Sequence, residues 1–156
     1  MSFKFLIQRA QETDLLRIPE IGLDLRVILP SSASGESLVV METKNAPGFG
    51  TPLHRHRETE VFRVLEGRYL FEVDGEQFEA SAGDLVSVPG GAAHAFVNLT
   101  AKPARQLVMM LPGIDALAFF EGLGRVFAQG RPTRDKLNEY GAPWHTEFLG
   151  PPISTK

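Results

Sequence analysis

The region from Gly48 to Leu111 consists of short runs of β-branched, aromatic and other apolar residues, which glycines and prolines separate. In chain order these runs read VFRVLEG, RYLFEVDG, EQFEA, DLVSVP, AHAFVNL and RQLVMML. Many short strands at such close spacing are typical of an all-β sandwich or barrel. Asp74-Gly75 is a strong signal for a two-residue hairpin. The pattern therefore predicts an all-β fold for this region.

The segments on either side extend this prediction. Two more strand-like runs, 22–29 and 37–43, precede the region and enclose a turn-rich stretch. Further along, the apolar spacing over 114–127 becomes that of a helix, with one stripe formed by Ile114, Leu117, Phe120, Leu123 and Phe127.

The C-terminal part begins with a capping signal. Thr133 is a candidate N-cap for a second short helix, RDKLNEY, which Gly141 would end. The remainder, APWHTEFLGPPISTK, is rich in proline, so we expect an irregular tail laid over the surface of the domain.

Composition excludes several classes of protein. The net charge of −3 offers no basic field for nucleic acid, so we expect no such partner. No apolar run approaches 18 residues, so we expect no membrane span and no membrane partner. The chain has no cysteine, and any metal site must therefore use nitrogen and oxygen ligands. The absence of disulfides also fits a cytoplasmic location, which we expect.

In the stretch GFGTPLHRHRETEVFRVLEG, two histidines and a glutamate all have even residue numbers. In a strand, alternate side chains share a face, so His54, His56 and Glu60 would point the same way, together with Phe62 and Val64. Two imidazoles and a carboxylate would then converge on the interior of a barrel. An isolated charge there is costly, and binding a metal resolves that cost.

A third histidine follows in GDLVSVPGGAAHAFVN. His94, Phe96 and Asn98 share a face on their own strand, and the turn at Pro89–Gly91 could swing His94 toward the first pair. Strand parity alone leaves that approach open.

These two stretches resemble the two signature motifs of the cupin superfamily. The first motif is matched by Gly48, His54, His56, Glu60 and Gly67, and the second by Gly83, Pro89, Gly91, His94 and Asn98. Fifteen residues separate the motifs, as in compact members of the family. Each of the ten residue types has a background frequency of about a few per cent, so coincidence is negligible.

The resemblance implies a fold and a metal site. The fold is a double-stranded β-helix, or jelly roll, formed as a single domain over residues 1–156, with the motif-bearing core at about 35–112 and a C-terminal helix and tail at 113–156. The implied ligands of one divalent transition metal per chain (Fe, Mn, Ni, Co, Cu or Zn) are His54, His56, Glu60 and His94.

Four protein ligands leave one or two positions open on an octahedral metal, which permits several functions. The first is a dioxygenase for an aromatic or enol-type small molecule. In quercetinase-like cupins the glutamate both binds the metal and takes a substrate proton, which makes Glu60 the candidate catalytic residue. Phe62, Val64 and Phe96 would form the apolar substrate pocket. The alternatives are a non-catalytic module that binds or senses a small ligand and a metal-dependent isomerase.

Three further interpretations concern residues outside the motifs. An isomerase would use a second base, and the only histidine left for it is His145, which we interpret as a tail residue. The Phe119-Phe120 pair is interpreted as core packing or a subunit contact. Apolar residues on the faces opposite the ligands predict a homodimer that covers them, namely Val61, Leu65, Val97 and Leu99.

Overall fold

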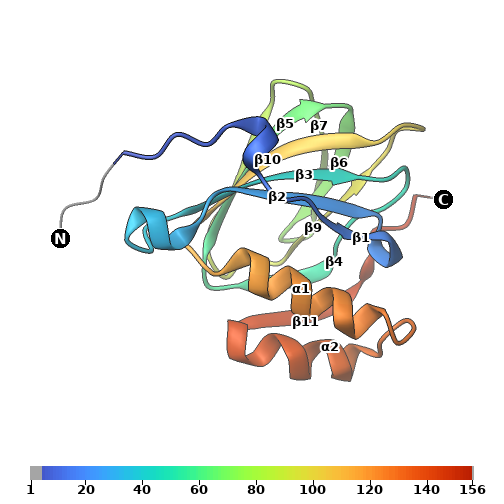
Figure 1. Cartoon of the computed structure of the whole chain (residues 1–156). Helices are drawn as coiled ribbons and strands as arrows, with labels where there is room; N and C mark the ends of the chain where they lie inside the picture. Colours follow the sequence, from blue (N-terminus) through green and yellow to red (C-terminus); the bar gives the residue numbers. More distant parts are fainter. Residues whose placement is uncertain (1–4, 156) are drawn as a thin grey trace.

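The computed structural model describes residues 5–155, which form two antiparallel sheets that face each other (Figure 1). The first sheet has six strands in the order β1 (Leu16–Ile18), β2 (Leu23–Leu29), β3 (Val39–Asn45), β10 (Ala104–Leu111), β5 (Thr59–Glu66) and β8 (Leu85–Val88). The second has five in the order β11 (Thr146–Pro152), β4 (Pro52–His56), β9 (His94–Asn98), β6 (Arg68–Val73) and β7 (Glu76–Ser81). The predicted all-β jelly roll is confirmed.

Alternation along the strands places the core between the sheets. In β10, every second residue from Ala104 to Met110 is buried, and the residues between them are half-buried. The core contains an aromatic group in which Phe62 packs edge-on against Phe71 and Phe96, with ring centroids 5.2 and 5.6 Å apart. Rings in this arrangement attract each other beyond the gain from their burial. This aromatic group therefore joins β5 of the first sheet to β6 and β9 of the second.

The hairpin between β6 and β7 forms at the predicted turn. Asp74 and Gly75 both have positive φ, 47° and 85°. A two-residue turn with this backbone matches the twist of the flanking strands. Asp74 also accepts a hydrogen bond at Oδ1 from the Ala93 amide, 3.0 Å away, which fixes the hairpin beside the start of β9.

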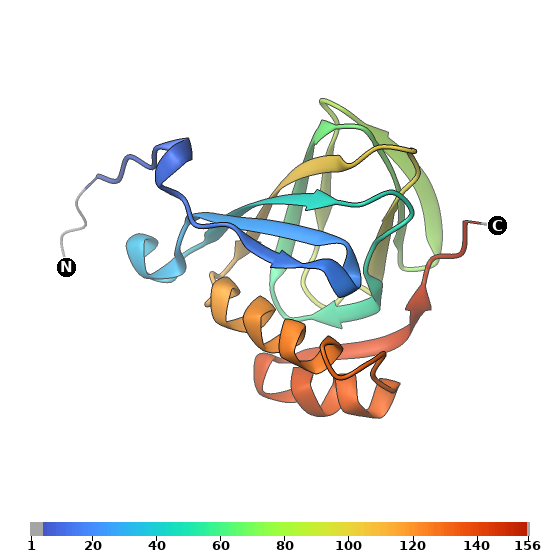
Figure 2. The ribbon, with the colours of Figure 1, turned by 45° about the vertical axis from the view of Figure 1, so that its right-hand side comes forward.

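Two helices lie side by side beneath the barrel, as Figures 1 and 2 show. These are α1 (Ala116–Phe127) and α2 (Arg134–Gly141), and short 3-10 turns occupy Ala10–Glu12, Pro19–Ile21, Ser31–Ser34 and Ala142–Trp144. Asp115 caps α1 by accepting from the Ala118 amide. Thr133, the predicted N-cap, caps α2 by accepting from the Lys136 amide. Neither helix, nor any other in residues 5–155, has the length and hydrophobicity needed to cross a bilayer.

The C-terminal segment differs from its prediction. The tail does not run irregularly over the surface, because residues 146–152 form β11 and pair with β4. Within this strand Phe148 is buried and lies opposite His54. Two prolines obscured the pattern, but they occupy the end of an edge strand, where a missing amide costs least.

Candidate metal centre

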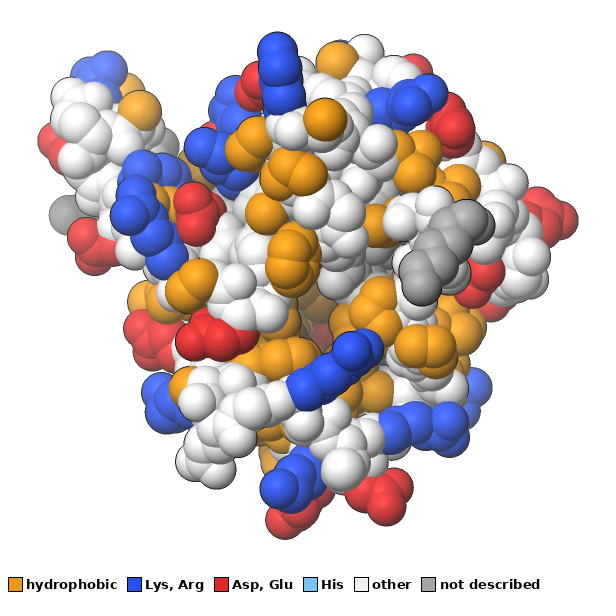
Figure 3. Space-filling model, turned by 90° about the vertical axis from the view of Figure 1, so that its right-hand side faces the viewer, with side chains coloured by type: hydrophobic (Ala, Val, Ile, Leu, Met, Phe, Trp, Pro, Cys, Tyr) orange, Lys and Arg blue, Asp and Glu red, His pale blue; other side chains and the backbone are white. Residues whose placement is uncertain are grey.

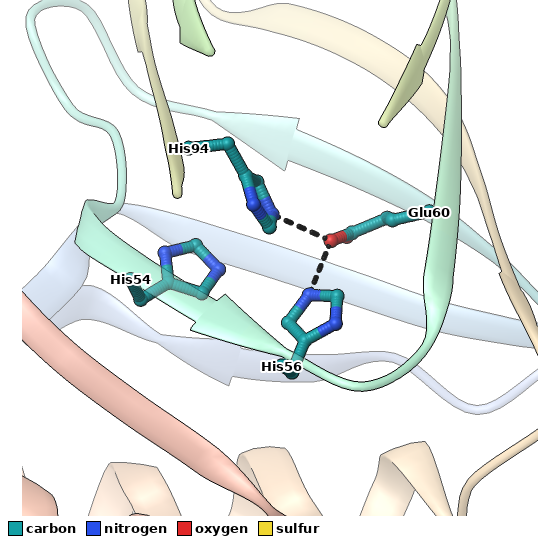
Figure 4. A group of neighbouring side chains, drawn as sticks. All are labelled: His54, His56, Glu60 and His94. Atoms are coloured by element: carbon teal, nitrogen blue, oxygen red, sulfur yellow. Dashed lines mark hydrogen bonds and ion pairs between the residues drawn. The ribbon is translucent and has the colours of Figure 1, made fainter. Parts of the chain in front are cut away.

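Three strands bring the four predicted ligands together. His54 and His56 lie on β4, Glu60 lies at the start of β5, and His94 begins β9 (Figure 4). Their ligand atoms all lie within 4.8 Å of one another. A turn at Arg57 and Glu58 separates β4 from β5, so the strand is not continuous as the parity argument assumed, yet the even-numbered residues still face the interior.

The turn before β9 fixes His94 relative to the other histidines. The Gly91 amide donates to the His56 carbonyl over 2.7 Å. A Cβ atom at Gly90 would lie 2.1 Å from the Arg57 carbonyl oxygen, so only glycine permits this close approach. His54 and His94 are register partners across β4 and β9 as a result. The interpretation of Pro89–Gly91 as the turn that directs His94 is confirmed.

Each histidine is oriented through its Nδ1 atom. In all three rings Nδ1 lies within hydrogen-bond distance of a main-chain carbonyl two residues away, at 2.7 Å from Pro52 for His54, 3.1 Å from Glu58 for His56 and 2.9 Å from Ala92 for His94. A neutral ring that donates from Nδ1 keeps a lone pair on Nε2. Hydrogen bonds of this kind orient metal-binding histidines.

The contacts of Glu60 test whether these residues fit a metal ion. Its Oε2 atom lies 2.8 Å from His56 Nε2 and 3.0 Å from His94 Nε2 (Figure 4). If both rings donate from Nδ1, these are contacts between acceptors, which repel unless a proton or a cation lies between them. Adjacent ligands of an octahedral ion with bonds of about 2.1 Å are about 3.0 Å apart. The spacing and the donor types therefore fit one divalent transition metal.

Burial and mutual contacts set the protonation of the group. Burial, with the neighbouring His94, lowers the pKa of His54 from its ordinary 6.5 to about 3. Burial is the largest single influence on His56 and acts in the same direction, but the hydrogen bond to Glu60 and the charges of Glu60 and Glu58 together outweigh it and raise the pKa of His56. Burial is also the largest single influence on Glu60 and raises its pKa, but the hydrogen bonds and the charges of His56 and His94 together outweigh it and hold that pKa well below its ordinary range. Burial and mutual contacts therefore favour a neutral His54 and an ionised Glu60.

The ligand group opens on a cavity of about 120 Å³ between the two sheets and the C-terminal elements. Phe62 and Phe96 line it, as predicted. Val64 is buried in the core and is not among the lining residues, because it lies two residues further along β5, opposite Gln106. Phe119 and Phe120 pack against each other with centroids 5.1 Å apart, as interpreted, but they also line the cavity.

Several cavity residues were not predicted from the sequence, and three of them change the interpretation of the site. Trp144 and Phe148 come from the tail that was expected to be irregular. Glu58 is 1% exposed, lines the cavity, and has an Oε2 atom 3.5 Å from His56 Nδ1 with no hydrogen-bond partner among the described residues. The sequence could have predicted Glu58 as a cavity residue, because its even number predicts the same strand face as that of the ligands.

Three further residues lie outside the ligand group, and one of them, His145, was interpreted from the sequence as a tail residue. His145 is exposed and lies outside this cavity. Asn98 is buried and cross-links backbone, with Nδ2 donating to the carbonyls of Asn45 and Lys102 over 3.0 and 2.8 Å. Arg55 pairs with Glu147 in solvent, which agrees with a solvated outer strand face.

The fold and the site together define a small jelly-roll barrel with a group of three histidines and one glutamate that can hold one metal ion. Residues 41–110 match the cupin domain family, and the chain belongs to the cupin superfamily.

Three curated relatives share part of the sequence. An uncharacterized protein of Methanocaldococcus jannaschii is 31% identical over 97 residues, which are 61% of this chain and 78% of the relative. Gentisate 1,2 dioxygenase 1 of Aquipseudomonas alcaligenes is 33% identical over 105 residues, and quercetin 2,3-dioxygenase of Bacillus subtilis is 28% identical over 71. These matches cover 62% and 45% of this chain but only 29% and 21% of the two dioxygenases.

Solved structures have the same fold. A predicted oxalate decarboxylase from Thermotoga maritima superposes with a TM-score of 0.64 at 22% identity, covering 69% of this chain and 99% of its own. A nucleoside dehydratase from Streptomyces gives a TM-score of 0.63 at 13% identity and covers 96% of this chain and 95% of its own. At these identities the likeness concerns the fold alone.

Proposed function

We propose that this chain is a metal-dependent dioxygenase that acts on a small aromatic or enol-type molecule. The observation that carries the proposal is the position of the ligand group, at the wall of an apolar cavity, with His54, His56 and Glu60 themselves among the lining residues. The partial likeness to two dioxygenases supports the same assignment, although the chain matches less than a third of either.

His54, His56, Glu60 and His94 would hold the metal, with the rings oriented by their Nδ1 hydrogen bonds. A divalent transition metal held there supplies a redox centre and a Lewis acid beside the substrate. His54, His56 and Glu60 line the same cavity as Phe62 and Phe96, so a substrate bound in this cavity would lie next to the ligand group.

Glu60 would have a second role, as a proton acceptor. A phenol or enol binds a metal as an anion and must lose a proton to do so. In the metal-free protein the contacts with His56 and His94 hold the pKa of Glu60 low, and a carboxylate that binds a metal is likewise ionised; Glu60 also lies at the cavity wall, where a substrate would enter. Phe62 and Phe96 would exclude water from the bound substrate.

The test combines metal analysis with oxygen uptake. Protein purified without chelators or a nickel affinity step should contain about one transition metal per chain. Protein reloaded with each candidate metal should then consume oxygen with at least one member of a panel of catechols, cyclic diketones and flavonols. A panel without oxygen uptake for any metal would refute the dioxygenase and favour a binding or sensing module.

A second candidate is a metal-dependent isomerase, which requires an additional base. Glu58 supplies a specific observation in its favour, since this buried carboxylate lines the cavity next to His56. The two candidates differ in outcome, because an isomerase would convert its substrate at the same rate with and without oxygen.

A further inference from the structure

The wall of the cavity is almost entirely apolar. Phe62 and Phe96 come from the sheets, Phe119, Phe120 and Leu123 from α1, and Phe148 from β11. Figure 3 shows one face of the molecule with a hollow that hydrophobic side chains border. Contact between such a wall and an apolar ligand is favourable, and its free energy grows in proportion to the apolar area removed from water. The cavity therefore favours a ligand whose body is a hydrocarbon ring or chain.

The size of the cavity limits that body. Its volume of about 120 Å³ is slightly below the roughly 150 Å³ of an engineered apolar cavity that holds one benzene molecule. A ligand of one substituted ring fills such a space. Two or three fused or linked rings need a wall residue to move, and packed walls resist that movement.

The charges in the wall select against a second anionic group. Among the described residues that line the cavity there is no lysine or arginine, and the two ionisable acids, Glu58 and Glu60, are carboxylates. A ligand carboxylate or phosphate that enters loses its hydration and finds no cation except the metal. It would also lie near Glu58, whose Oε2 atom is already without a hydrogen-bond partner among residues 5–155.

Besides Glu58, the wall has a neutral polar side chain with an atom that is free among the described residues. Thr43 lines the cavity, is 6% exposed, and its Oγ1 atom bonds to nothing within the described part of the chain. A hydroxyl can bond to a hydroxyl or a carbonyl of a ligand, but it compensates no charge. The volume of the cavity, its apolar wall and its lack of a lysine or arginine among the described residues therefore favour the same kind of ligand.

We propose that the ligand of this cavity is a molecule of about one ring that is neutral apart from its metal-binding oxygen, such as an alkyl-substituted catechol or a cyclic enol, and carries no carboxylate or phosphate. The inference rests on the proposed function, since it assumes that the ligand binds the metal through an ionisable oxygen. It narrows that function by excluding aromatic acids, sugar phosphates and multi-ring flavonols.

The charge argument is tested with two probes of matched shape. 4-Methylcatechol and 3,4-dihydroxybenzoate differ by a methyl group in place of a carboxylate. The protein is loaded with zinc, which does not react with oxygen, and binding is followed by calorimetry and by the fluorescence of Trp144, the chain's one tryptophan and a lining residue. We expect 4-methylcatechol to bind at least tenfold more tightly. Equal or tighter binding of the carboxylate, or no binding of 4-methylcatechol, would overturn the inference.

The size argument is tested with a variant that gains binding, which a misfolded protein cannot do. Wild-type protein should bind 2,3-dihydroxynaphthalene at least tenfold more weakly than 4-methylcatechol. Phe120→Ala should reduce this difference to less than threefold, because it removes a ring from the wall. Glu121→Ala, at an exposed neighbouring position on α1, should leave it unchanged. Wild-type binding of the two-ring probe as tight as that of 4-methylcatechol would contradict the inference.

The proposed dioxygenase activity and the proposed class of ligand can be refuted independently of each other. Oxygen uptake is measured on protein loaded with iron, manganese, nickel, cobalt or copper, with 4-methylcatechol as the probe. If the zinc protein shows the expected binding preferences and no metal supports oxygen uptake, the dioxygenase is refuted while the ligand class stands. If oxygen uptake is faster with 3,4-dihydroxybenzoate, the dioxygenase stands and the ligand class is wrong.

Discussion

His54 and His94 are forty residues apart in the sequence, yet they face each other across β4 and β9 with ring centroids 4.3 Å apart. Each ring is held by a hydrogen bond from Nδ1 to a carbonyl of its own strand or turn. Strand pairing and these hydrogen bonds therefore position both rings. A ligand group positioned in this way loses little conformational freedom on binding, which favours tight binding.

Removal of one ring from this group should abolish most metal binding. His56→Ala removes a ligand and the hydrogen-bond partner of Glu60, so we expect metal content to fall from about one per chain to less than a tenth. The matched control is His145→Ala, which changes an exposed histidine outside the cavity and should retain full metal content. Elemental analysis of both proteins measures their metal content per chain. Full occupancy in His56→Ala would show that His56 is not a ligand.

Protons should compete with the metal as the pH falls. Histidine binds a metal only when neutral, and the contacts with Glu60 and Glu58 raise the pKa of His56 above its ordinary 6.5, so in the metal-free protein His56 takes up a proton at a higher pH than a free imidazole does. His54 competes only at much lower pH, because its pKa is lowered to about 3. Metal affinity should fall about tenfold per pH unit for each histidine that must release a proton. Chelator competition between pH 5 and 8 measures it, and an affinity that stays constant to pH 5 would exclude histidine ligation.

The turn that connects the two halves of the site should tolerate no larger residue. In Gly90→Ala the new Cβ would lie 2.1 Å from the Arg57 carbonyl oxygen, so the turn must move. We expect a loss of about 1–3 kcal/mol in the free energy of unfolding, as for other overpacked positions, and weaker metal binding with all four ligands still present.

The matched control for this change is Gly150→Ala, where the nearest atom to the new Cβ is 3.7 Å away, an ordinary contact. Its free energy of unfolding and its metal affinity should stay close to wild type. Denaturant unfolding of both variants makes the comparison. Equal stability for the two alanine variants would mean that the close approach at Gly90 does not constrain the site.

Parity in the sequence predicted the direction of the ligands because the period of a strand is two, and this period survives the turn at Arg57 and Glu58. The same rule applies to Glu58, which is buried and lines the cavity although it is not a motif position. The approach of His94 required the family resemblance, since strand pairing between distant segments depends on the whole topology rather than on local pattern.

The C-terminal wall of the cavity was not predictable in the same way. Phe148 and Trp144 belong to a segment with prolines and no clear period, and their positions depend on the pairing of β11 with β4. Likewise, Phe119 and Phe120 have the spacing of ordinary core residues on a helix. Whether such a face fills a core or borders a cavity depends on the distance between packed elements, which helical spacing does not encode.

The expected homodimer remains a prediction, with its surface now better defined. Val97 is 1% exposed within one chain and needs no partner, and α1 lies beneath the barrel rather than over an outer face. Leu65 and Leu85 remain 40% and 57% exposed on the outside of the first sheet. Light scattering at micromolar concentration should give twice the 17.2 kDa mass of the chain. Leu65→Lys should shift the mass toward the monomer, and a monomeric wild type would refute the prediction.

The last prediction separates the two roles of Glu60. Glu60→Gln keeps an oxygen that can bind the metal but removes the carboxylate that accepts a proton. We expect the variant to retain part of its metal, since the three histidines and the amide oxygen remain, while turnover of a substrate found by the oxygen-uptake panel falls by about a hundredfold or more, the usual contribution of a general base.

The control for this comparison is turnover per bound metal rather than per chain, so that a lower metal content does not imitate a loss of catalysis. Glu58→Gln provides the matched variant, because it changes a buried carboxylate that lines the same cavity but is not among the four ligands. A dioxygenase that uses Glu60 as its base loses far more activity per metal in Glu60→Gln than in Glu58→Gln. A larger loss of activity per metal in Glu58→Gln would identify Glu58 as the proton acceptor. Wild-type turnover in Glu60→Gln would show that Glu60 serves only as a metal ligand.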